Sequence, residues 1–249
     1  PGLRGADEGG VKVGLTLPQF QEDPEPCLRV AGQAEAAGID GVFAFDHLWA
    51  IGRPDHPALH GPSLVAALAV ETRRLRVGTL VARVGLVADD VLLAALSTLA
   101  DMAGGRLVAG VGVGDRLSEG ENRAYGVPFP AVSERRERLR ASCRRLRQLG
   151  IETWVGGLSA GTRAAGRAEA DALNLWEVAP TAIASELSRP DAVAVTWGGR
   201  IEVSRGARAV ETVLRSLAGA GATWAVVAPV GLPWPAAVET VAEAREALR

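Results

Sequence analysis

The 249-residue sequence predicts a closed (β/α)8 barrel, the α/β fold known as the TIM barrel. Three observations favour it. The chain has the length of about 250 residues that is typical of this fold. Apolar segments that read as strands alternate eight times with segments that read as helices, and no linker interrupts the series. The strands are almost continuously apolar, as strands are when a parallel sheet is buried on both faces. A doubly wound open sheet is the structural alternative.

The first half of the chain supplies four strand–helix units. The apolar run VKVGLTL reads as the first strand and ends at Pro18, and the helix after it stops at Gly38. GVFAF, LRVGTLV and RLVAGVG read as the next three strands. Ser133 is expected to cap the fourth helix, whose seven arginines are interrupted by glutamates, as on a solvated outer face. The strands are expected at 11–17, 41–45, 75–81 and 106–112, and the helices at 24–37, 61–72, 89–102 and 133–149.

The second half repeats the pattern with shorter elements. Each apolar run is again followed by an alanine-rich segment with helical spacing. The expected strands are 151–156, 172–177, 192–196 and 223–228, and the expected helices are 159–170, 182–187, 207–217 and 236–248. Residues 1–10 are rich in glycine and charge, which predicts a disordered terminus or a remnant of cloning. Residues 11–249 are expected to form a single barrel domain.

Composition limits the partners. Lys and Arg number 27 against 29 Asp and Glu, so the net charge gives no reason to expect nucleic acid or an anionic membrane as partner. No apolar run is long enough to span a bilayer, and the first residues lack the hydrophobic core of a signal peptide. The two cysteines, Cys27 and Cys143, show no zinc spacing and are expected as free thiols. We therefore expect a cytoplasmic protein.

The stretch AGGRLVAGVGVGDRLSEGENRAY, residues 103–125, organises the site. Glycine occupies every second position of its strand, which lets a flat ligand or another backbone approach closely. A dinucleotide fingerprint is excluded, because the spacing G-x-G-x-x-G is not met. The strand is expected to open into a polar loop that carries Asp115, Glu119 and Glu121. In an α/β barrel, the loops that follow the strands are where the chemistry lies.

Two strand ends carry groups that transfer protons. Asp46 and His47 follow the second strand and Asp115 follows the fourth, so an imidazole and a carboxylate are expected on one face of the barrel. A rim histidine with a structural role is the alternative, and the sequence leaves both open. His56 and His60 lie in the same loop as His47 without helical spacing, so no metal site is expected.

A second candidate site follows the fifth strand. In WVGGLSAGTRAAG, Gly156 and Gly157 precede a helix whose first turn offers Ser159 and Thr162. Free backbone N–H groups at a helix start, with small residues and hydroxyls nearby, favour phosphate binding. An ordinary turn that needs glycine for its dihedral angles remains the alternative.

The chain resembles the luciferase-like monooxygenase superfamily, and within it the branch of oxidoreductases that use the deazaflavin coenzyme F420. The resemblance rests on AEAAGIDGVFAFDHLW, LRVGTLV, LSTLADMAGGRLVAGVGVGD and WVGG, and it covers most of the chain from Val11 to about Trp176. It implies a barrel that holds a flavin or deazaflavin across the C-terminal ends of its strands. The segment between the fourth helix and the fifth strand is shorter here than in such relatives, which implies an open or remodelled pocket.

The resemblance also implies roles for individual residues. Thr79 and Leu80 match the bulge, often with a non-prolyl cis peptide, that supports the ring of the coenzyme. Val113, Gly114 and Asp115 are implied to lie along the ring. His47 is implied as the acid/base and Asp115, a glutamate in sugar-phosphate dehydrogenases, as its partner at the ring. Asp46 is implied, with His47, to face the reacting edge of the ring and to contact the cofactor, and the phosphate is assigned to Gly156, Gly157 and Ser159.

These features predict an F420-dependent oxidoreductase that transfers hydride between its coenzyme and a small organic substrate. Two alternatives remain open from the sequence. The first is an FMN-dependent monooxygenase of the same fold, because both cofactor phosphates would use the same Gly-Gly turn. The second is a non-catalytic barrel that has lost cofactor binding, which the shortened segment motivates. Relatives commonly dimerise, so a homodimer is possible.

Overall fold

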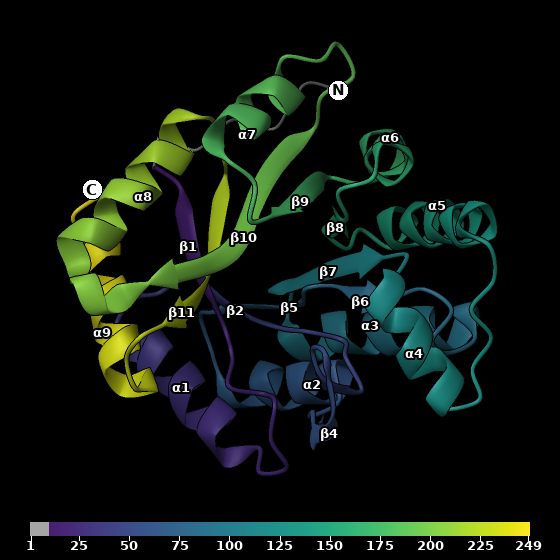
Figure 1. Ribbon diagram of the computed structural model, residues 1–249, viewed down its shortest axis with the longest axis horizontal. Helices are drawn as coiled ribbons and strands as arrows, with labels where there is room; N and C mark the ends of the chain where they lie inside the picture. Colours follow the sequence, from purple (N-terminus) through teal and green to yellow (C-terminus); the bar gives the residue numbers. More distant parts are fainter. Residues whose placement is uncertain (1–9) are drawn as a thin grey trace.

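The computed structural model describes residues 10–249; residues 1–9, most of the predicted disordered terminus, lie outside the described range. Within it, parallel strands close into a barrel and helices surround them (Figure 1). The third strand consists of two pieces, β5 and β6, which both pair with β7. The barrel strands are β1 (Lys12–Thr16), β2 (Gly41–Ala44), β5 (Arg76–Thr79), β6 (Ala82–Arg83), β7 (Leu107–Gly112), β8 (Thr153–Gly156), β9 (Ala172–Trp176), β10 (Ala194–Glu202) and β11 (Trp224–Val230).

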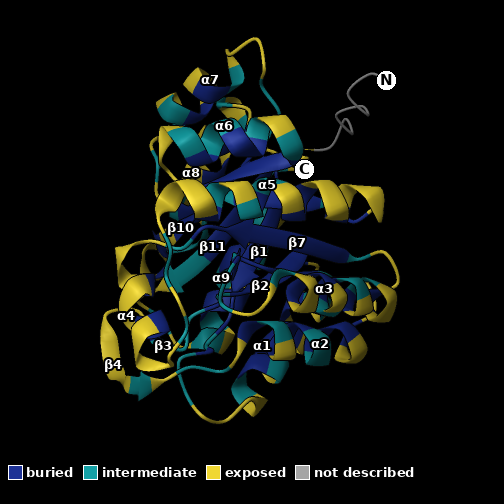
Figure 2. Cartoon of the chain, turned by 90° about the vertical axis from the view of Figure 1, so that its right-hand side faces the viewer, coloured by how far each residue is buried: buried dark blue, intermediate teal, exposed yellow. Residues whose placement is uncertain are grey.

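The helices bury their inner faces against the strands and expose their outer faces (Figure 2). They are α1 (Glu25–Ala36), α2 (Gly61–Glu71), α3 (Asp89–Ala103), α4 (Arg116–Ala124), α5 (Val132–Gln148), α6 (Ala160–Glu169), α7 (Pro180–Leu187), α8 (Ala207–Gly219) and α9 (Trp234–Glu246). The closed barrel confirms the predicted fold and excludes the open-sheet alternative. None of the helices within residues 10–249 combines the length and the apolar character that a bilayer crossing requires.

Three aromatic rings fill the inside of the barrel. The Phe43 ring centroid lies 5.3 Å from that of Trp154 and 5.7 Å from that of Trp224, and the two indoles lie 5.6 Å apart. Glycines make room for them: a Cβ on Gly14 would lie 2.8 Å from the Phe43 ring. Aromatic pairs at these separations contribute beyond their buried area. The cluster therefore forms a solid floor below the C-terminal ends of the strands.

The alternating glycines of β7 accommodate another backbone and a side chain. A Cβ on Gly110 would lie 2.0 Å from the carbonyl oxygen of Thr79, and one on Gly112 would lie 2.6 Å from Val81. Gly156 on β8 makes the same space for Val81 from the other side, at 2.7 Å. Of the two possibilities that the sequence leaves open, close approach of another backbone explains Gly110.

Four local predictions were wrong. The expected polar loop after β7 contains helix α4, and the expected loop after β2 contains a hairpin, β3 (Trp49–Ala50) and β4 (Arg53–Pro57). Ser133 does not cap α5, because that helix begins at Val132 after Ala131. Strand β10 continues to Glu202, well past the predicted end at residue 196, because Thr196–Glu202 pair with β11.

The short connection between α5 and β8, residues 149–152, is present as predicted, but it has a different consequence. It precedes β8, so it lies at the N-terminal end of the barrel strands, whereas Gly156 lies at the other end. Its length therefore does not decide how open the C-terminal face is. That face is covered by segments that follow strands: the β3–β4 hairpin, α4 and residues 126–131.

Replacement of Gly110 tests the close approach between β7 and the third strand. We expect Gly110→Ala to lower the free energy of unfolding by about 3 kcal/mol, because the new methyl group must displace the Thr79 backbone. Urea denaturation measures this. The matched control is Gly32→Ala on the exposed face of α1, where a Cβ meets nothing within 4 Å and should be neutral or slightly stabilising. Equal stability of both variants would contradict the packing described here.

Candidate active site

The C-terminal ends of the strands surround a cavity of about 1170 Å3. It reaches from the end of β2, over β6 and β7, to the ends of β8 and β9 and the first turn of α6. All but one of the residues predicted for the site line it: Asp46, His47, Leu80, Val113, Gly114, Asp115, Gly156, Gly157 and Ser159. The segments that the sequence analysis assigned to one site therefore do converge.

Thr79 is the exception. Its side chain is fully buried, and its hydroxyl donates a hydrogen bond to the carbonyl oxygen of Gly110 at 2.7 Å, so it ties the third strand to β7. A non-prolyl cis peptide is present, but it joins Leu80 to Val81, one bond later than the predicted pair. Leu80 and Val81 are the residues of this segment that face the cavity. Leu80 and Val81 therefore line the cavity and Thr79 does not, while a contact of any of these residues with a cofactor stays a prediction.

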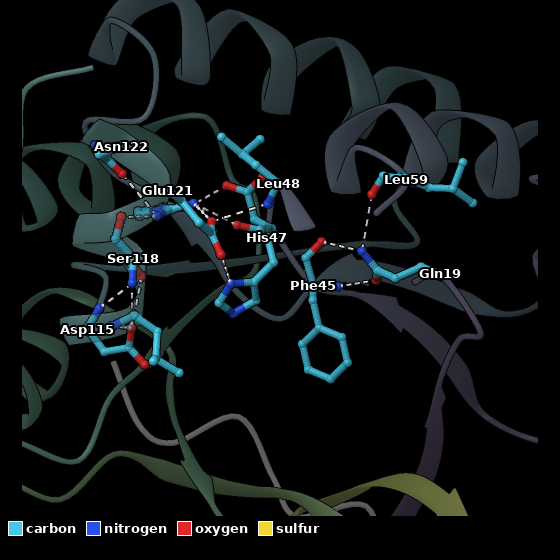
Figure 3. A network of polar contacts seen from close by, with 12 residues as sticks. Gln19, Phe45, His47, Leu48, Leu59, Asp115, Ser118, Glu121 and Asn122 are labelled. Carbon is cyan, nitrogen blue, oxygen red and sulfur yellow. Dashed lines mark hydrogen bonds and ion pairs between the residues drawn. The ribbon is translucent and has the colours of Figure 1, made fainter. Parts of the chain in front are cut away.

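His47 is held by a buried glutamate. Its Nδ1 lies 2.7 Å from a carboxylate oxygen of Glu121, a residue that is 1% exposed (Figure 3). The second oxygen of Glu121 accepts from Arg83 Nη2 at 2.6 Å and from the backbone N–H of Leu48 at 3.2 Å. A carboxylate only accepts hydrogen bonds, so Nδ1 of His47 carries the proton. Nε2, which points away from Glu121, is the free basic nitrogen (Figure 3).

The charge of Glu121 is stabilised by its partners. Burial alone would raise its pKa, but the bonds from His47 and Arg83 outweigh burial and hold the pKa below its ordinary range. Arg83 is itself only 3% exposed and also donates to the Ser118 carbonyl and to the Asn122 side chain, both at 3.0 Å. This network is fully hydrogen-bonded around a buried ion pair, the condition under which such a pair is stable.

Asp115 lies beside this network without bonding to His47. Its Oδ1 accepts from the backbone N–H groups of Leu117 and Ser118 and from the Ser118 hydroxyl, all at 3.0 Å, which caps the N-terminus of α4. Burial acts to raise the pKa of Asp115, but the bonds from Ser118 and the nearby His47 lower it. The predicted His47–Asp115 pair is thus corrected to His47–Glu121, and a role of Asp115 at a bound ring stays a prediction.

Asp46 has one oxygen free. Its Oδ2 accepts from the backbone N–H of Arg83 at 2.8 Å, whereas Oδ1 is buried and has no partner in the described part of the chain. Burial raises the pKa of this carboxyl, although the Arg83 contact opposes the rise. A buried polar atom without a partner is costly, so Asp46 is suited to a hydrogen bond from or to a ligand.

The Gly-Gly turn forms a concave cradle at the start of α6. Gly157 has φ of +143°, a value that only glycine adopts readily, and it leads directly into the helix. Ser159 is the N-cap: its hydroxyl accepts from the backbone N–H of Thr162 at 3.2 Å and contacts the Thr162 hydroxyl at 2.8 Å. The first backbone N–H groups of α6 remain available to an anion.

Sequence reasoning missed Arg83 and Glu121 as a pair. Both stand in segments that it recognised, but 38 positions separate them, and α4 was expected as a loop. One signal could have found the helix: Asp115 followed three residues later by Ser118 is a capping pattern. Among the described residues, no group of three His, Cys, Asp or Glu side chains lies as a metal ion would require.

Comparisons with known proteins place these residues in a wider group. The family model described as luciferase-like monooxygenase matches residues 9–197. A curated relative, the F420-dependent glucose-6-phosphate dehydrogenase of Kineococcus radiotolerans, is 35% identical over 151 residues, a match that covers 58% of this chain and 42% of the relative. The match therefore spans less than half the length of that relative.

Solved structures share the fold at low sequence identity. One is an F420-dependent secondary alcohol dehydrogenase in complex with an F420-acetone adduct, with a TM-score of 0.80, 14% identity, and coverage of 96% of this chain and 99% of that one. Another is the oxygenating constituent of 3,6-diketocamphane monooxygenase from Pseudomonas putida, in complex with FMN, with a TM-score of 0.71, 13% identity, and coverage of 94% and 97%. Both confirm the barrel.

Replacement of Glu121 tests the buried pair. We expect Glu121→Gln to lower the free energy of unfolding by about 3 kcal/mol at neutral pH, because Arg83 then keeps a buried charge without an acid. The folded-state pKa of Glu121 is depressed, so its contribution is complete above about pH 4.3, the ordinary value for Glu, and is lost as pH falls through the folded-state pKa. The difference between wild type and variant should therefore shrink in acid.

Urea denaturation at several pH values measures this difference. The matched control is Glu119→Gln on the same helix, where the glutamate pairs with Arg123 at an exposed position. Such a pair contributes less than about 1 kcal/mol. A difference between Glu121→Gln and wild type that stays constant down to strongly acidic pH would refute the assignment.

Proposed function

Because the chain belongs to the luciferase-like monooxygenase family, we propose that it is an oxidoreductase that uses coenzyme F420 and transfers hydride between this deazaflavin and a small organic substrate. The observation that carries the proposal is the His47–Glu121 pair, which presents a free imidazole nitrogen to a large cavity. The relative named as an F420-dependent dehydrogenase supports the choice of coenzyme. Because the match covers 42% of that relative, its sugar-phosphate substrate is not transferred to this chain.

The cavity residues fit a planar coenzyme with an anionic arm. The volume of about 1170 Å3 exceeds the range of about 300–1,000 Å3 that is usual for small-ligand sites. Leu80, Val81 and Val113 offer an apolar wall for a ring, and Asp46 Oδ1 offers a buried partner for a polar ring atom. The cradle of Gly156, Gly157 and Ser159 offers N–H groups to a phosphate.

His47 is the proposed acid/base. When bound, the coenzyme supplies the site that gains or gives up the hydride. His47 Nε2 takes the proton from a substrate hydroxyl when the substrate is oxidised, and returns it in the opposite direction. Glu121 keeps Nδ1 protonated and stabilises the positive imidazolium that forms, while Arg83 keeps Glu121 charged. Proton transfer by such a positioned histidine does not need a metal ion.

Two alternative functions are less well supported than the use of F420. An FMN-dependent monooxygenase would use the same cradle, and a structural neighbour of that kind contains FMN. The curated relatives named for F420 favour the deazaflavin over this option. A non-catalytic barrel is less well supported, because the cavity is open and His47 is positioned by a buried acid that a purely structural role would not require.

The proposal also includes a small-molecule substrate and a cytoplasmic location, which cell fractionation tests.

We further propose that the chain forms a homodimer. Helices α2 and α3 pack side by side, and both expose apolar side chains on their outer faces: Val70 is 52% exposed, Val91 57% and Met102 43%. We expect the chain to sediment as a dimer and the double substitution Val91→Glu with Met102→Glu to give monomers. Analytical ultracentrifugation checks this, and a wild-type monomer would contradict it.

Replacement of His47 tests the function. We expect His47→Ala to reduce turnover of F420 by about a hundredfold to ten-thousandfold, the usual contribution of a general base, and to leave the dissociation constant for F420 unchanged. Fluorescence titration measures binding, and the absorbance of the oxidised coenzyme measures turnover with a panel of small alcohols. His56→Ala, at a partly exposed position on β4 that does not line the cavity, is the matched control and should retain full turnover.

Each alternative predicts a separate result in this experiment. If the wild-type protein binds FMN and not F420, its cofactor is the flavin and the proposed deazaflavin is wrong. Wild-type protein that binds either compound without turnover of any tested alcohol, and without oxygen uptake, would support the non-catalytic barrel.

A further inference from the structure

The arginines along the cavity fall into two groups. Arg83 and Arg200 each have an acid: Arg83 pairs with Glu121, and Arg200 forms two hydrogen bonds with Glu177. The second group has no carboxylate within ion-pair distance among residues 10–249, and its members come from the N-terminal turns of α4 and α5: Arg116, Arg135 and Arg136. Two carboxylates, Asp115 and Glu119, also line this wall, and Glu119 acts on Arg135 from a distance, but neither forms an ion pair with the three arginines. The wall therefore carries an excess of positive charge.

Arg135 is the buried member of the second group. It is 8% exposed, Nε donates to the carbonyl oxygen of Val113 at 2.7 Å, and Nη1 donates to that of Pro130. The guanidinium carbon lies 3.8 Å from the centroid of the Phe129 ring, so ring stacking fixes the plane of the group. Nη2 has no partner within the described residues, and the side chain borders the cavity. The guanidinium is thus rigid and partly unused.

A buried cation without an anion is energetically unfavourable. Burial lowers the pKa of Arg135, which reflects the cost of removing the charge from water. Arginine stays protonated in proteins, so the charge is present in the cavity at every physiological pH. The two carbonyl groups and the Phe129 ring reduce the energetic cost of burying the guanidinium. They are neutral, however, and do not cancel its positive charge. Binding of an anion at Nη2 would neutralise it.

Arg136, the next residue on α5, lines the same cavity and extends to the start of α6. Its guanidinium lies directly on Gly161 in the first turn of α6, where a Cβ would meet the guanidinium carbon at 2.7 Å. Its Nε is buried and has no partner in the described part of the chain. The guanidinium is therefore in contact with the positive end of the α6 dipole, and an anion bound beside both in the cavity would stabilise this arrangement.

We propose that Arg135, assisted by Arg136, binds an anionic group of a ligand in the cavity. The geometry fits a phosphate group or a carboxylate, because the guanidinium presents coplanar donors that match two oxygens of either. The source is either the coenzyme or the substrate, and the experiment separates the two. This inference deepens the proposed function, because it adds a binding residue for an anionic group and restricts the ligands to those that carry one.

The experiment measures binding of inorganic phosphate to the apo protein and to the protein saturated with F420, by isothermal titration calorimetry. We expect Arg135→Gln to weaken phosphate binding by about tenfold, the order expected for loss of one charge-assisted hydrogen bond. Arg147→Gln removes an equal charge from the exposed end of the same helix and is the matched control, for which no change is expected.

The identity of the anion follows from two further titrations. If the coenzyme supplies it, Arg135→Gln weakens binding of F420 but not of the same deazaflavin without its phosphate, and F420 displaces inorganic phosphate. If the substrate supplies it, F420 binds the variant as it binds wild type, and phosphate still binds the F420-saturated wild-type protein. Either result supports the proposal, because both depend on Arg135.

The proposal is overturned if Arg135→Gln melts at the temperature of the Arg147→Gln control and binds phosphate and F420 as that control does. If the glutamine variant does not fold, Arg135→Lys keeps the charge without the planar fork, and unchanged phosphate affinity in that variant overturns the proposal equally. Phosphate binding does not require F420, so wild-type protein that binds phosphate through Arg135 but not F420 would refute the proposed function and leave this inference intact.

Discussion

The buried carboxylate of Glu121 is the interaction on which the site depends. It connects three parts of the chain that are distant in sequence: the end of β2 through His47 and Leu48, the third strand through Arg83, and α4, which carries it. A carboxylate in this position is stable only because cationic and N–H donors occupy both of its oxygens. The same bonds that keep Glu121 charged also fix the orientation of the imidazole. Stability and chemistry are therefore linked through one side chain.

Below this network, the shape of the cavity is set by where side chains are missing. The third strand lies close to β7 and β8 because side chains are missing at Gly110, Gly112 and Gly156. Val81 therefore fills the space between β7 and β8. The aromatic cluster around Phe43 fills the barrel below, which keeps the cavity at the strand ends and does not let it continue through the barrel. The glycines leave space at the strand ends, and the aromatic rings fill the barrel below that space. The bottom of the cavity is therefore closely packed before a ligand binds.

The sequence predicted the order of the barrel elements and most of the residues that face the cavity, because both follow from local patterns. Apolar strands, alternating helices and the Gly-Gly turn before α6 are visible in short windows of sequence. The pairing of His47 is not visible in this way, because its partner lies 74 positions away on a helix that is mostly polar. Helix α4 shows no apolar stripe, since the face that it buries consists of Ser118, Glu121 and Asn122. Only their placement over Arg83 makes those residues buried.

The distribution of charge separates what holds the site together from what the site can bind. Arg83 and Glu121 neutralise one another behind His47, so this pair exerts little net field on a ligand. Among residues 10–249, the direct contacts of the Arg135 guanidinium are carbonyl groups and an aromatic ring, and Glu119 is the nearby acid that acts on it without forming an ion pair. Part of its charge therefore remains to act across the cavity. Asp46 lies at the other end, where burial raises the pKa of its carboxyl. Along the wall of α4 and α5, three arginines, Arg116, Arg135 and Arg136, outnumber the two carboxylates of Asp115 and Glu119, so this wall has an excess of positive charge, whereas the Arg83–Glu121 pair balances the charge beside the imidazole. A ligand with an anionic group at one end and a neutral reacting group at the other would match both regions and be oriented by them.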